Sequence, residues 1–350
     1  MNRVYLDWNA TAPLRPEARK AMAEAGEMVG NPSSVHAEGR AAKMALERAR
    51  ETIAAALGAE GADIVFTSGA TEAAALALAG RDLACAAIEH DAIGAWCRPV
   101  LPVDSSGRVT VSDPGQSTLQ LANSETGVMQ TLPEGLAVSD LTQAFGKVPF
   151  GFNWSGIAAG IVSAHKLGGP KGVGALILRP GTDLEARIRG GGQERGRRAG
   201  TENLIGIAGF AAAAEAAQRD LEAGIREKLS VMRNSLRSGL EDAAAEVTFP
   251  GHDTDCLPNT LCILTPGWRG ETQVMQMDLA GFAVSAGSAC SSGKVRPSSV
   301  LRAMGVSEAD AACAIRVSIG RDTTSDELDR FASAWIQAHD RWRKRRESRA

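Results

Sequence analysis

Short apolar runs alternate with helical stretches along the chain from about residue 60 onward. Runs of strand length lie at 63–67, 83–89, 118–122, 157–163 and 174–178. Segment 68–80 (SGATEAAALALAG), directly after the first run, has the pattern of a turn entering a helix. This alternation is typical of a mostly parallel sheet covered by helices, and such sheets bind ligands at the carboxyl ends of their strands.

Longer helical patterns flank this region. They cover 38–57, 203–243 (one long helix or two in tandem) and 326–346. A chain of 350 residues is long enough for two domains. We expect a large domain over 16–240 and a small domain formed by 1–15 together with 241–350.

Composition and charge exclude several classes of protein. Hydrophobic residues make up 44% and charged residues 23%, which excludes a disordered, collagen-like or coiled-coil chain. Residues 341–350 hold six of the 38 basic residues and one of the 41 acidic ones, so the body carries a charge of −8. An acidic body argues against a nucleic-acid partner, and we interpret the basic tail as a solvated helix end.

The chain has no run of about eighteen apolar residues, and its first residues lack the apolar core of a signal peptide. We therefore expect no membrane association. Six cysteines are present without a CxxC or zinc-type spacing, so we expect reduced thiols, no metal site and a cytoplasmic protein.

Two polar motifs follow predicted strands. In 67–72 (TSGATE), Gly69 permits close backbone approach and a helix start that attracts an anion such as a phosphate; an ordinary cap by Ser68 is the alternative. In 163–172 (SAHKLGGPKG), Lys166 directly follows an apolar run. A lysine of lowered pKa there could hold a carbonyl cofactor as a Schiff base, whereas a surface lysine on a turn is the alternative. Pyridoxal phosphate has both the carbonyl and the phosphate.

Two further motifs are rich in glycine. Segment 190–201 (GGGQERGRRAGT) suits oxyanions through its arginines, although a solvated loop has the same composition. Segment 287–293 (GSACSSG) places Cys290 among small polar residues after an apolar run. That setting favours a mobile, nucleophilic thiol over a small core residue.

In this order and spacing, the four motifs resemble those of the cysteine desulfurases, pyridoxal-phosphate enzymes of the class V aminotransferase group. The resemblance extends from 5–7 (YLD) through 31–36 (NPSSVH) to 315–321 (IRVSIGR), nearly the whole chain. It implies the type I pyridoxal-phosphate fold, an α/β architecture with a large, mostly parallel sheet domain, helices on both faces and a smaller α+β domain. It also implies a homodimer that converts L-cysteine to L-alanine and leaves sulfur on Cys290, for a protein acceptor in iron–sulfur cluster, thio-cofactor or tRNA biosynthesis.

The resemblance also assigns roles to residues around the cofactor. Lys166 would hold the cofactor and move the substrate α-proton, Asp140 would pair with the pyridine nitrogen, Gln143 would bond the ring's phenolic oxygen, and His90 would stack on the ring. The phosphate would be bound by Ala70, Thr71, Ser163 and His165, with Thr201 from the partner subunit. Ser124 would contact the cofactor, Asn123 and Arg316 the substrate, and Cys290 would become the persulfide.

Some positions depart from the family pattern. Ser124 stands where relatives have a longer asparagine, and Gln193 where many have histidine. The stretches 90–123 and 127–140 are short, which predicts trimmed crossover helices. A selenocysteine or cystine lyase would depend less on Cys290, another class V enzyme such as an aminotransferase would not need the GSAC motif, and a non-catalytic binding module would need neither Cys290 nor Lys166.

Overall fold

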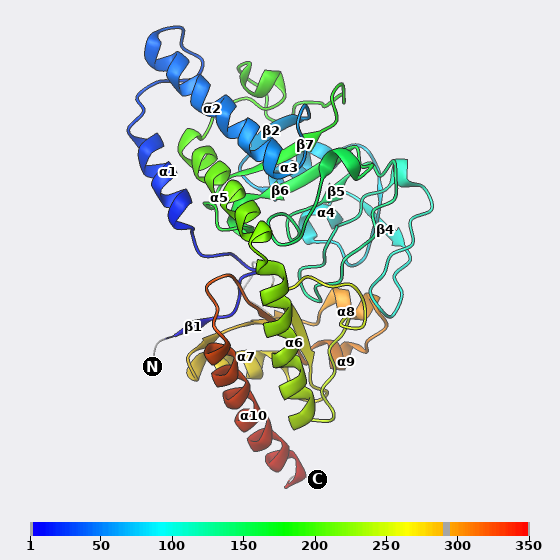
Figure 1. Cartoon of the computed structure of the whole chain (residues 1–350). Coiled ribbons are helices and arrows are strands. Elements are labelled where there is room, and N and C mark those ends of the chain that lie inside the picture. The colour runs from blue at the N-terminus through cyan, green and yellow to red at the C-terminus, as the bar shows by residue number, and fades with distance from the viewer. Residues whose placement is uncertain (1–2, 290–294, 349–350) are drawn as a thin grey trace.

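The computed structural model describes residues 3–289 and 295–348. Two layered parts lie one above the other, with the N-terminal strand beside the lower part and the C-terminal helix extending from it (Figure 1). Cys290 lies outside the described residues.

The upper part is built on a mixed sheet. Its regular strands run in the order β2 (Asp63–Thr67), β7 (Gly174–Leu178), β6 (Ala159–Ser163) and β5 (Ser139–Asp140). Strand β7 is antiparallel to both neighbours, whereas β5 and β6 are parallel. Parallel bridges through 117–118 connect β5 to β3 (Ala84–Ala86), which pairs in parallel with β4 (Arg98–Leu101). The expected mostly parallel sheet is thus confirmed.

Helices cover both faces of this sheet because successive strand residues point to opposite sides. Ile64 and Phe66 of β2 face a core shared with α2 (Ala37–Ala56) and α5 (Leu204–Glu222), and α1 (Pro16–Gly26) packs on α5. Val65, between them, faces the opposite core with α3 (Ala70–Leu78) and the short α4 (Asp91–Gly94).

The lower part has its own sheet and core. Strand β13 (Ala314–Ser318) pairs antiparallel with β8 (Thr260–Leu264) and β10 (Ser285–Ala286), and β1 (Val4–Tyr5) pairs in parallel with β9 (Phe282–Ala283). Helices α7 (Gly270–Leu279) and α10 (Ser325–Glu347) pack with this part around buried Trp268, Phe331 and Trp335. The remaining elements are α8 (Ser299–Ala303), α9 (Glu308–Ala311) and the antiparallel pair β11 (Ser288–Ala289) and β12 (Val295–Arg296).

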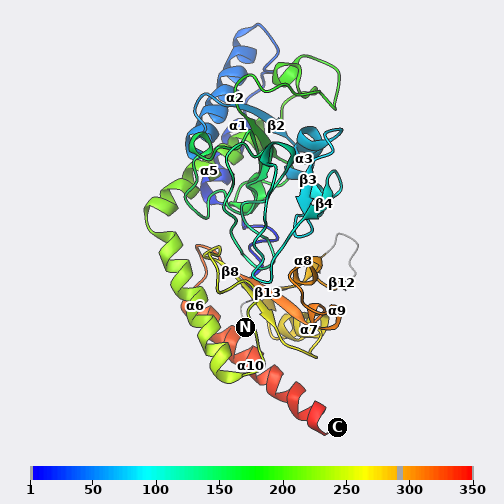
Figure 2. The same cartoon turned by 90° about the vertical axis from the view of Figure 1, so that its right-hand side faces the viewer.

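The predicted helical stretch 203–243 forms two helices in tandem. Gly224, in the left-handed region at φ +84°, separates α5 from α6 (Ile225–Ala243). Helix α6 carries Leu229, Leu236 and Leu240 into the lower core and lies against α10 (Figure 2). The expected domain boundary at residue 240 therefore cuts through a packed helix end, and we propose that the boundary lies at Gly224 instead.

The short crossover stretches form few helical turns, as expected. Between His90 and Asn123 the chain forms the four-residue α4, strand β4 and one 3-10 turn at Pro114–Gln116. Residues 127–138, all described, form turns and extended segments without a helix. In the described ranges, no helix is both long and apolar enough to cross a membrane.

Candidate active site

A cavity of about 700 Å³ lies between the carboxyl edge of the upper sheet and the lower part. Residues that follow β2, β5 and β6 line it from above, and β10 and β13 contribute Ser285 and Arg316. Ten of the predicted site residues line it together: Ala70, Thr71, His90, Ser124, Asp140, Gln143, Ser163, His165, Lys166 and Arg316. The prediction that chemistry gathers at the ends of the strands is confirmed by this arrangement.

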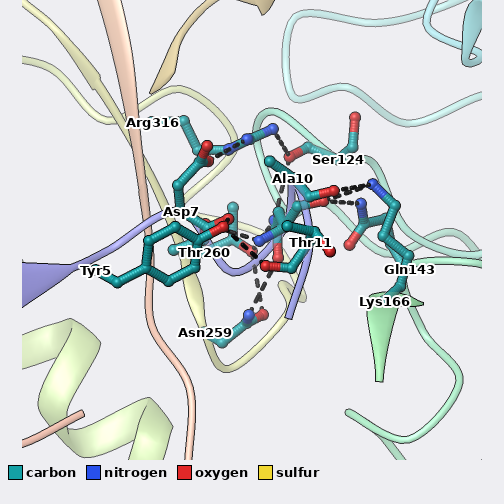
Figure 3. A network of polar contacts seen from close by, with 12 residues as sticks. Tyr5, Asp7, Ala10, Thr11, Ser124, Gln143, Lys166, Asn259, Thr260 and Arg316 are labelled. Atoms are coloured by element: carbon teal, nitrogen blue, oxygen red, sulfur yellow. Dashed lines mark hydrogen bonds and ion pairs between the residues drawn. The ribbon is translucent and has the colours of Figure 1, made fainter. Parts of the chain in front are cut away.

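Lys166 lies in the 3-10 turn that follows β6. Its Nζ donates to the backbone carbonyl oxygens of Asn9 (2.7 Å) and Ala10 (2.9 Å). Figure 3 shows the Lys166 side chain directed at Ala10. Burial, and next the charge of Arg316, lower the pKa of the Lys166 amine to about 8. A neutral amine can donate both hydrogens to these carbonyls while its lone pair stays available to a carbonyl carbon.

The start of α3 suits a phosphate. Helix α3 begins at Ala70, immediately after the turn from β2, and its N-cap Gly69 supplies no side-chain cap. The first N–H groups of a helix lack intrahelical partners and attract anions. His165 and Ser163 line the same cavity, and the His165 Nδ1 lies 3.2 Å from Thr11 Oγ1. Burial, and then the charges of Lys166, Lys171 and Lys147, lower the pKa of His165 to about 4.

Asp140 and His90 approach the cavity from the end of a strand and the start of a helix. Asp140 ends β5, and its Oδ1 accepts a hydrogen bond from the Thr142 N–H at 2.8 Å. His90 caps α4, and its Nδ1 accepts from the Ala92 N–H at 3.1 Å. This bond requires a lone pair on Nδ1, so the imidazole proton of the neutral ring is on Nε2.

Gln143 makes contacts from both ends of its amide. Its Nε2 donates to the Asn9 carbonyl oxygen at 3.0 Å, and its Oε1 accepts from Lys147 Nζ at 2.6 Å. The side chain is buried and lines the cavity. One amide hydrogen on Nε2 remains for a ligand, which fits the expected bond to a ring oxygen.

Arg316 reaches the cavity from β13. Its Nη2 contacts Asp7 Oδ1 at 2.7 Å, and its Nη1 donates to the Ser124 carbonyl oxygen at 3.0 Å. The residue is 8% exposed, and its Nε has no partner among the described residues. A buried, unpartnered guanidinium N–H beside a cavity fits recognition of a carboxylate.

Two predicted site residues lie elsewhere. Asn123 is 1% exposed and does not line the cavity. Its Nδ2 donates to the Ile88 carbonyl oxygen, and its Oδ1 accepts from the N–H groups of Glu125 and Thr126. These bonds shape the turn at 123–126, and the expected contact of Asn123 with substrate stays a prediction. Thr201 lines an adjoining cavity of about 140 Å³, which shares Ser68 and Gly172 with the main cavity.

The structure adds residues that sequence reasoning missed. Asn9 and Glu89 line the cavity, and Lys147 donates a hydrogen bond to Gln143, which also lines it. Glu89 Oε1 accepts from the Gln120 N–H at 2.7 Å, whereas its buried Oε2 has no partner among the described residues. Burial raises the pKa of Glu89 well above its usual range. The position of Lys147, four residues after Gln143 in a glycine-containing turn, was the available signal.

A lysine of lowered pKa, an uncapped helix start and an aspartate meet at the carboxyl edge of a mostly parallel sheet. These features fit the aldehyde, phosphate and pyridine nitrogen of pyridoxal phosphate, so the fold and site define a pyridoxal-phosphate enzyme of fold type I.

Comparisons with known proteins specify the family. The family model "Aminotransferase class-V" matches residues 4–93 and 118–331. A cysteine desulfurase from Cereibacter sphaeroides is 40% identical, over 95% of this chain and 94% of its own length. The cysteine desulfurase IscS from Dictyoglomus turgidum is 36% identical, over 93% of this chain and 92% of its own length. The chain belongs to the class V aminotransferase family, and within it to the cysteine desulfurases.

Solved structures agree with this placement. A NifS-like protein from Rickettsia africae matches with a TM-score of 0.88 at 30% identity, covering 97% of this chain and all (100%) of that one. A structure described as SspA in complex with cysteine matches with a TM-score of 0.73 at 27% identity, covering 90% and 98%. The stretch 94–117, outside the family match, is where the chain has its shortened crossover.

Proposed function

We propose that the chain converts L-cysteine to L-alanine and transfers the sulfur to Cys290. The observation that carries this proposal is the meeting of Lys166 and Arg316 in one cavity, from opposite parts of the molecule. An amine of lowered pKa can take a proton from the α-carbon of an amino acid, and an unpartnered guanidinium N–H can bind its carboxylate. Membership in the cysteine desulfurases supports cysteine as that amino acid.

Each side chain then has a defined task. Pyridoxal phosphate, when bound, supplies an electron sink for the electrons left on the substrate α-carbon. Its phosphate would be held by Ala70, Thr71, Ser163 and His165, and Asp140 would keep a proton on its ring nitrogen. Lys166 takes the α-proton, and Arg316 orients the substrate carboxylate.

Cys290 receives the sulfur in this proposal. Its thiolate attacks the substrate sulfur, an S–S bond forms, and the C–S bond breaks with its electron pair passing to the substrate. A proton at the β-carbon and one at the α-carbon complete L-alanine, and Cys290 is left as a persulfide. An acceptor protein then takes the terminal sulfur; its identity stays open, as does the expected cytoplasmic location.

We further propose that the protein acts as a homodimer. Thr201 does not line the cavity of its own Lys166 but an adjoining one, and the resemblance to the cysteine desulfurases, which assigns this threonine to the partner's phosphate, supports the proposal. Val29 and Val35, between α1 and α2, are 94% and 88% exposed, which supports burial of this region in an interface. Light scattering at micromolar concentration tests the mass, and a monomer with full activity would end this part of the proposal.

The decisive experiment follows sulfur and alanine release from L-cysteine, with and without reductant. Cys290→Ala should bind cofactor and substrate but lose nearly all desulfurase activity. After one turnover, mass spectrometry of wild type should find one added sulfur on the Cys290 peptide. The matched control is Cys97→Ala, at a half-buried thiol, which should keep activity. Full turnover in Cys290→Ala would indicate a lyase that expels its leaving group by elimination, and the added sulfur on Cys97 or Cys256 would also refute the proposal.

A further inference from the structure

A second lysine lies beneath the site without a role in the reaction described above. Lys147 is half-buried, and its Nζ donates to two side-chain oxygens, Gln143 Oε1 at 2.6 Å and Asn9 Oδ1 at 2.9 Å. Both acceptors belong to residues that line the cavity. We propose that Lys147 is a positioning residue, which fixes the Gln143 amide with its Nε2 turned toward the cavity. This inference rests on the proposed function only for the role of Gln143 toward the cofactor's ring oxygen.

The hydrogen bonds determine which way both amides face. Asn9 Nδ2 donates to the Ser124 carbonyl oxygen at 3.2 Å, and a carbonyl can only accept, so Asn9 Oδ1 is the atom that faces Lys147. Gln143 Nε2 donates to the Asn9 carbonyl oxygen at 3.0 Å, so its Oε1 also faces Lys147. Lys147 thus meets two oxygens.

The count of hydrogens fits this arrangement. Burial lowers the pKa of the Lys147 amine well below its usual range, and the charges of Lys166 and Arg316 lower it further. An ammonium has three N–H groups and a neutral amine has two, so Lys147 can donate to both oxygens in either form. Gln143 Nε2 also has two, one for the Asn9 carbonyl and one for a ligand in the cavity.

The same cluster includes the catalytic amine. The Asn9 carbonyl oxygen that accepts from Gln143 also accepts from Lys166 Nζ at 2.7 Å. Asn9 itself is held by the lower part, through Thr260 Oγ1 at 2.8 Å and Asn259 Nδ2 at 3.1 Å. Lys147 therefore acts on the donor for the ring oxygen through a cluster that spans both parts of the molecule.

The test compares Lys147→Met, Gln143→Met and the double variant. Met fills similar space but cannot donate, so Lys147→Met leaves Gln143 Oε1 without the lysine. A donor at the ring oxygen stabilises its anionic form, so its loss should raise the pH midpoint of the bound cofactor's visible absorbance change. We expect a rise of about one pH unit and a cofactor dissociation constant about tenfold higher in each single variant.

The double variant should match Gln143→Met, because Lys147 acts through Gln143. Lys20→Met, the same change at an exposed lysine of α1, should leave the midpoint unchanged. An unchanged midpoint in Lys147→Met, or additive shifts in the double variant, would overturn the inference. If Lys147→Met does not fold, Lys147→Gln takes its place. Its shorter side chain also removes the amine from Gln143, so the same shift is expected and the same results would overturn the inference.

These measurements are independent of turnover. Absorbance is recorded without L-cysteine, so a chain that releases no sulfide but shows the coupled shift would refute the proposed function and support the inference. A chain that is active on L-cysteine but shows uncoupled shifts would support the proposed function and refute the inference.

Discussion

The Asp7 carboxylate lies 2.7 Å from Nη2 of Arg316, so the arginine proposed to bind the substrate already has an anionic partner. The Ser124 carbonyl oxygen holds Nη1 of the same guanidinium. Two of its three nitrogens are thus engaged by the chain, which fixes the guanidinium plane before substrate arrives. The buried Nε is left as the donor without a partner among the described residues.

The first prediction concerns the charge of Asp7. Asp7 raises the pKa of Lys166, against the larger lowering by burial and by Arg316, and the balance leaves that pKa at about 8. Asp7→Asn keeps an oxygen near Arg316 but removes the negative charge. The Lys166 pKa should therefore fall further, by up to about one unit.

The measurement is the pH dependence of pyridoxal-phosphate uptake by the apo-protein, because the neutral amine is the nucleophile. Uptake should rise through a midpoint near pH 8 in the wild type and at lower pH in Asp7→Asn. Asp278→Asn, at an exposed carboxylate that pairs with Arg3, is the control and should titrate as wild type. A midpoint that rises in Asp7→Asn would contradict the prediction.

The second prediction concerns Asp140. Asp140→Asn keeps an acceptor for the Thr142 N–H but removes the charge that holds a proton on the cofactor's ring nitrogen. Cofactor should stay bound, while exchange of the L-alanine α-hydrogen for solvent deuterium should slow by about a hundredfold or more. Proton NMR in deuterium oxide measures this exchange, and a wild-type rate in the variant would remove Asp140 from its proposed role.

Much of the fold could be predicted because local pattern and tertiary packing agree. Strands 63–67 and 174–178 form with the predicted bounds, since their alternate residues enter the two cores on either side of the sheet. Lys166 and the turn before α3 were found because each directly follows a strand, where a ligand site forms.

The division at Gly224 and the role of Asn9 were harder to predict. A single glycine within a helical pattern is compatible with a continuous helix, so the sequence left one helix or two as alternatives. Asn9 lies more than 130 residues from Gln143 and Lys166, and such long-range contacts leave no periodic signal in the sequence. Asn123 was assigned to substrate by resemblance, whereas its burial and turn hydrogen bonds depend on the tertiary structure.

The third prediction concerns buried Glu89. Burial raises its pKa in the folded state, so the folded protein keeps a proton that the unfolded chain releases. Stability should therefore fall as pH rises from the unfolded value of about 4.5 toward the folded pKa. Glu89→Gln retains the acceptor for the Gln120 N–H and removes this titration. It should stabilise the protein at pH 8 by about 1–2 kcal/mol and have little effect at pH 4.5.

Urea unfolding of the apo-protein at both pH values measures the difference. Glu51→Gln, at an exposed carboxylate within α2, is the matched control and should change stability equally little at both. Destabilisation of Glu89→Gln at pH 8 would show that Glu89 is ionised in the folded state and would contradict the prediction.

The last prediction concerns His165 and the phosphate site. Burial first, and then the charges of Lys166, Lys171 and Lys147, lower its pKa from 6.5 to about 4 in the protein without ligand. The unfolded chain binds this proton more readily, so stability present above pH 6.5 should be lost as pH falls toward 4. Because His165 is only partly buried, the loss should be at most about 2 kcal/mol.

A phosphate dianion at the start of α3 has the opposite effect on the His165 pKa, since an adjacent negative charge favours imidazolium. NMR titration of the imidazole should therefore give a midpoint near 4 in the apo-protein and a higher one with saturating pyridoxal phosphate. His252 does not line the cavity, so it serves as an internal reference whose midpoint should be the same with and without the cofactor. A His165 midpoint that does not respond to the cofactor would place the phosphate away from this residue.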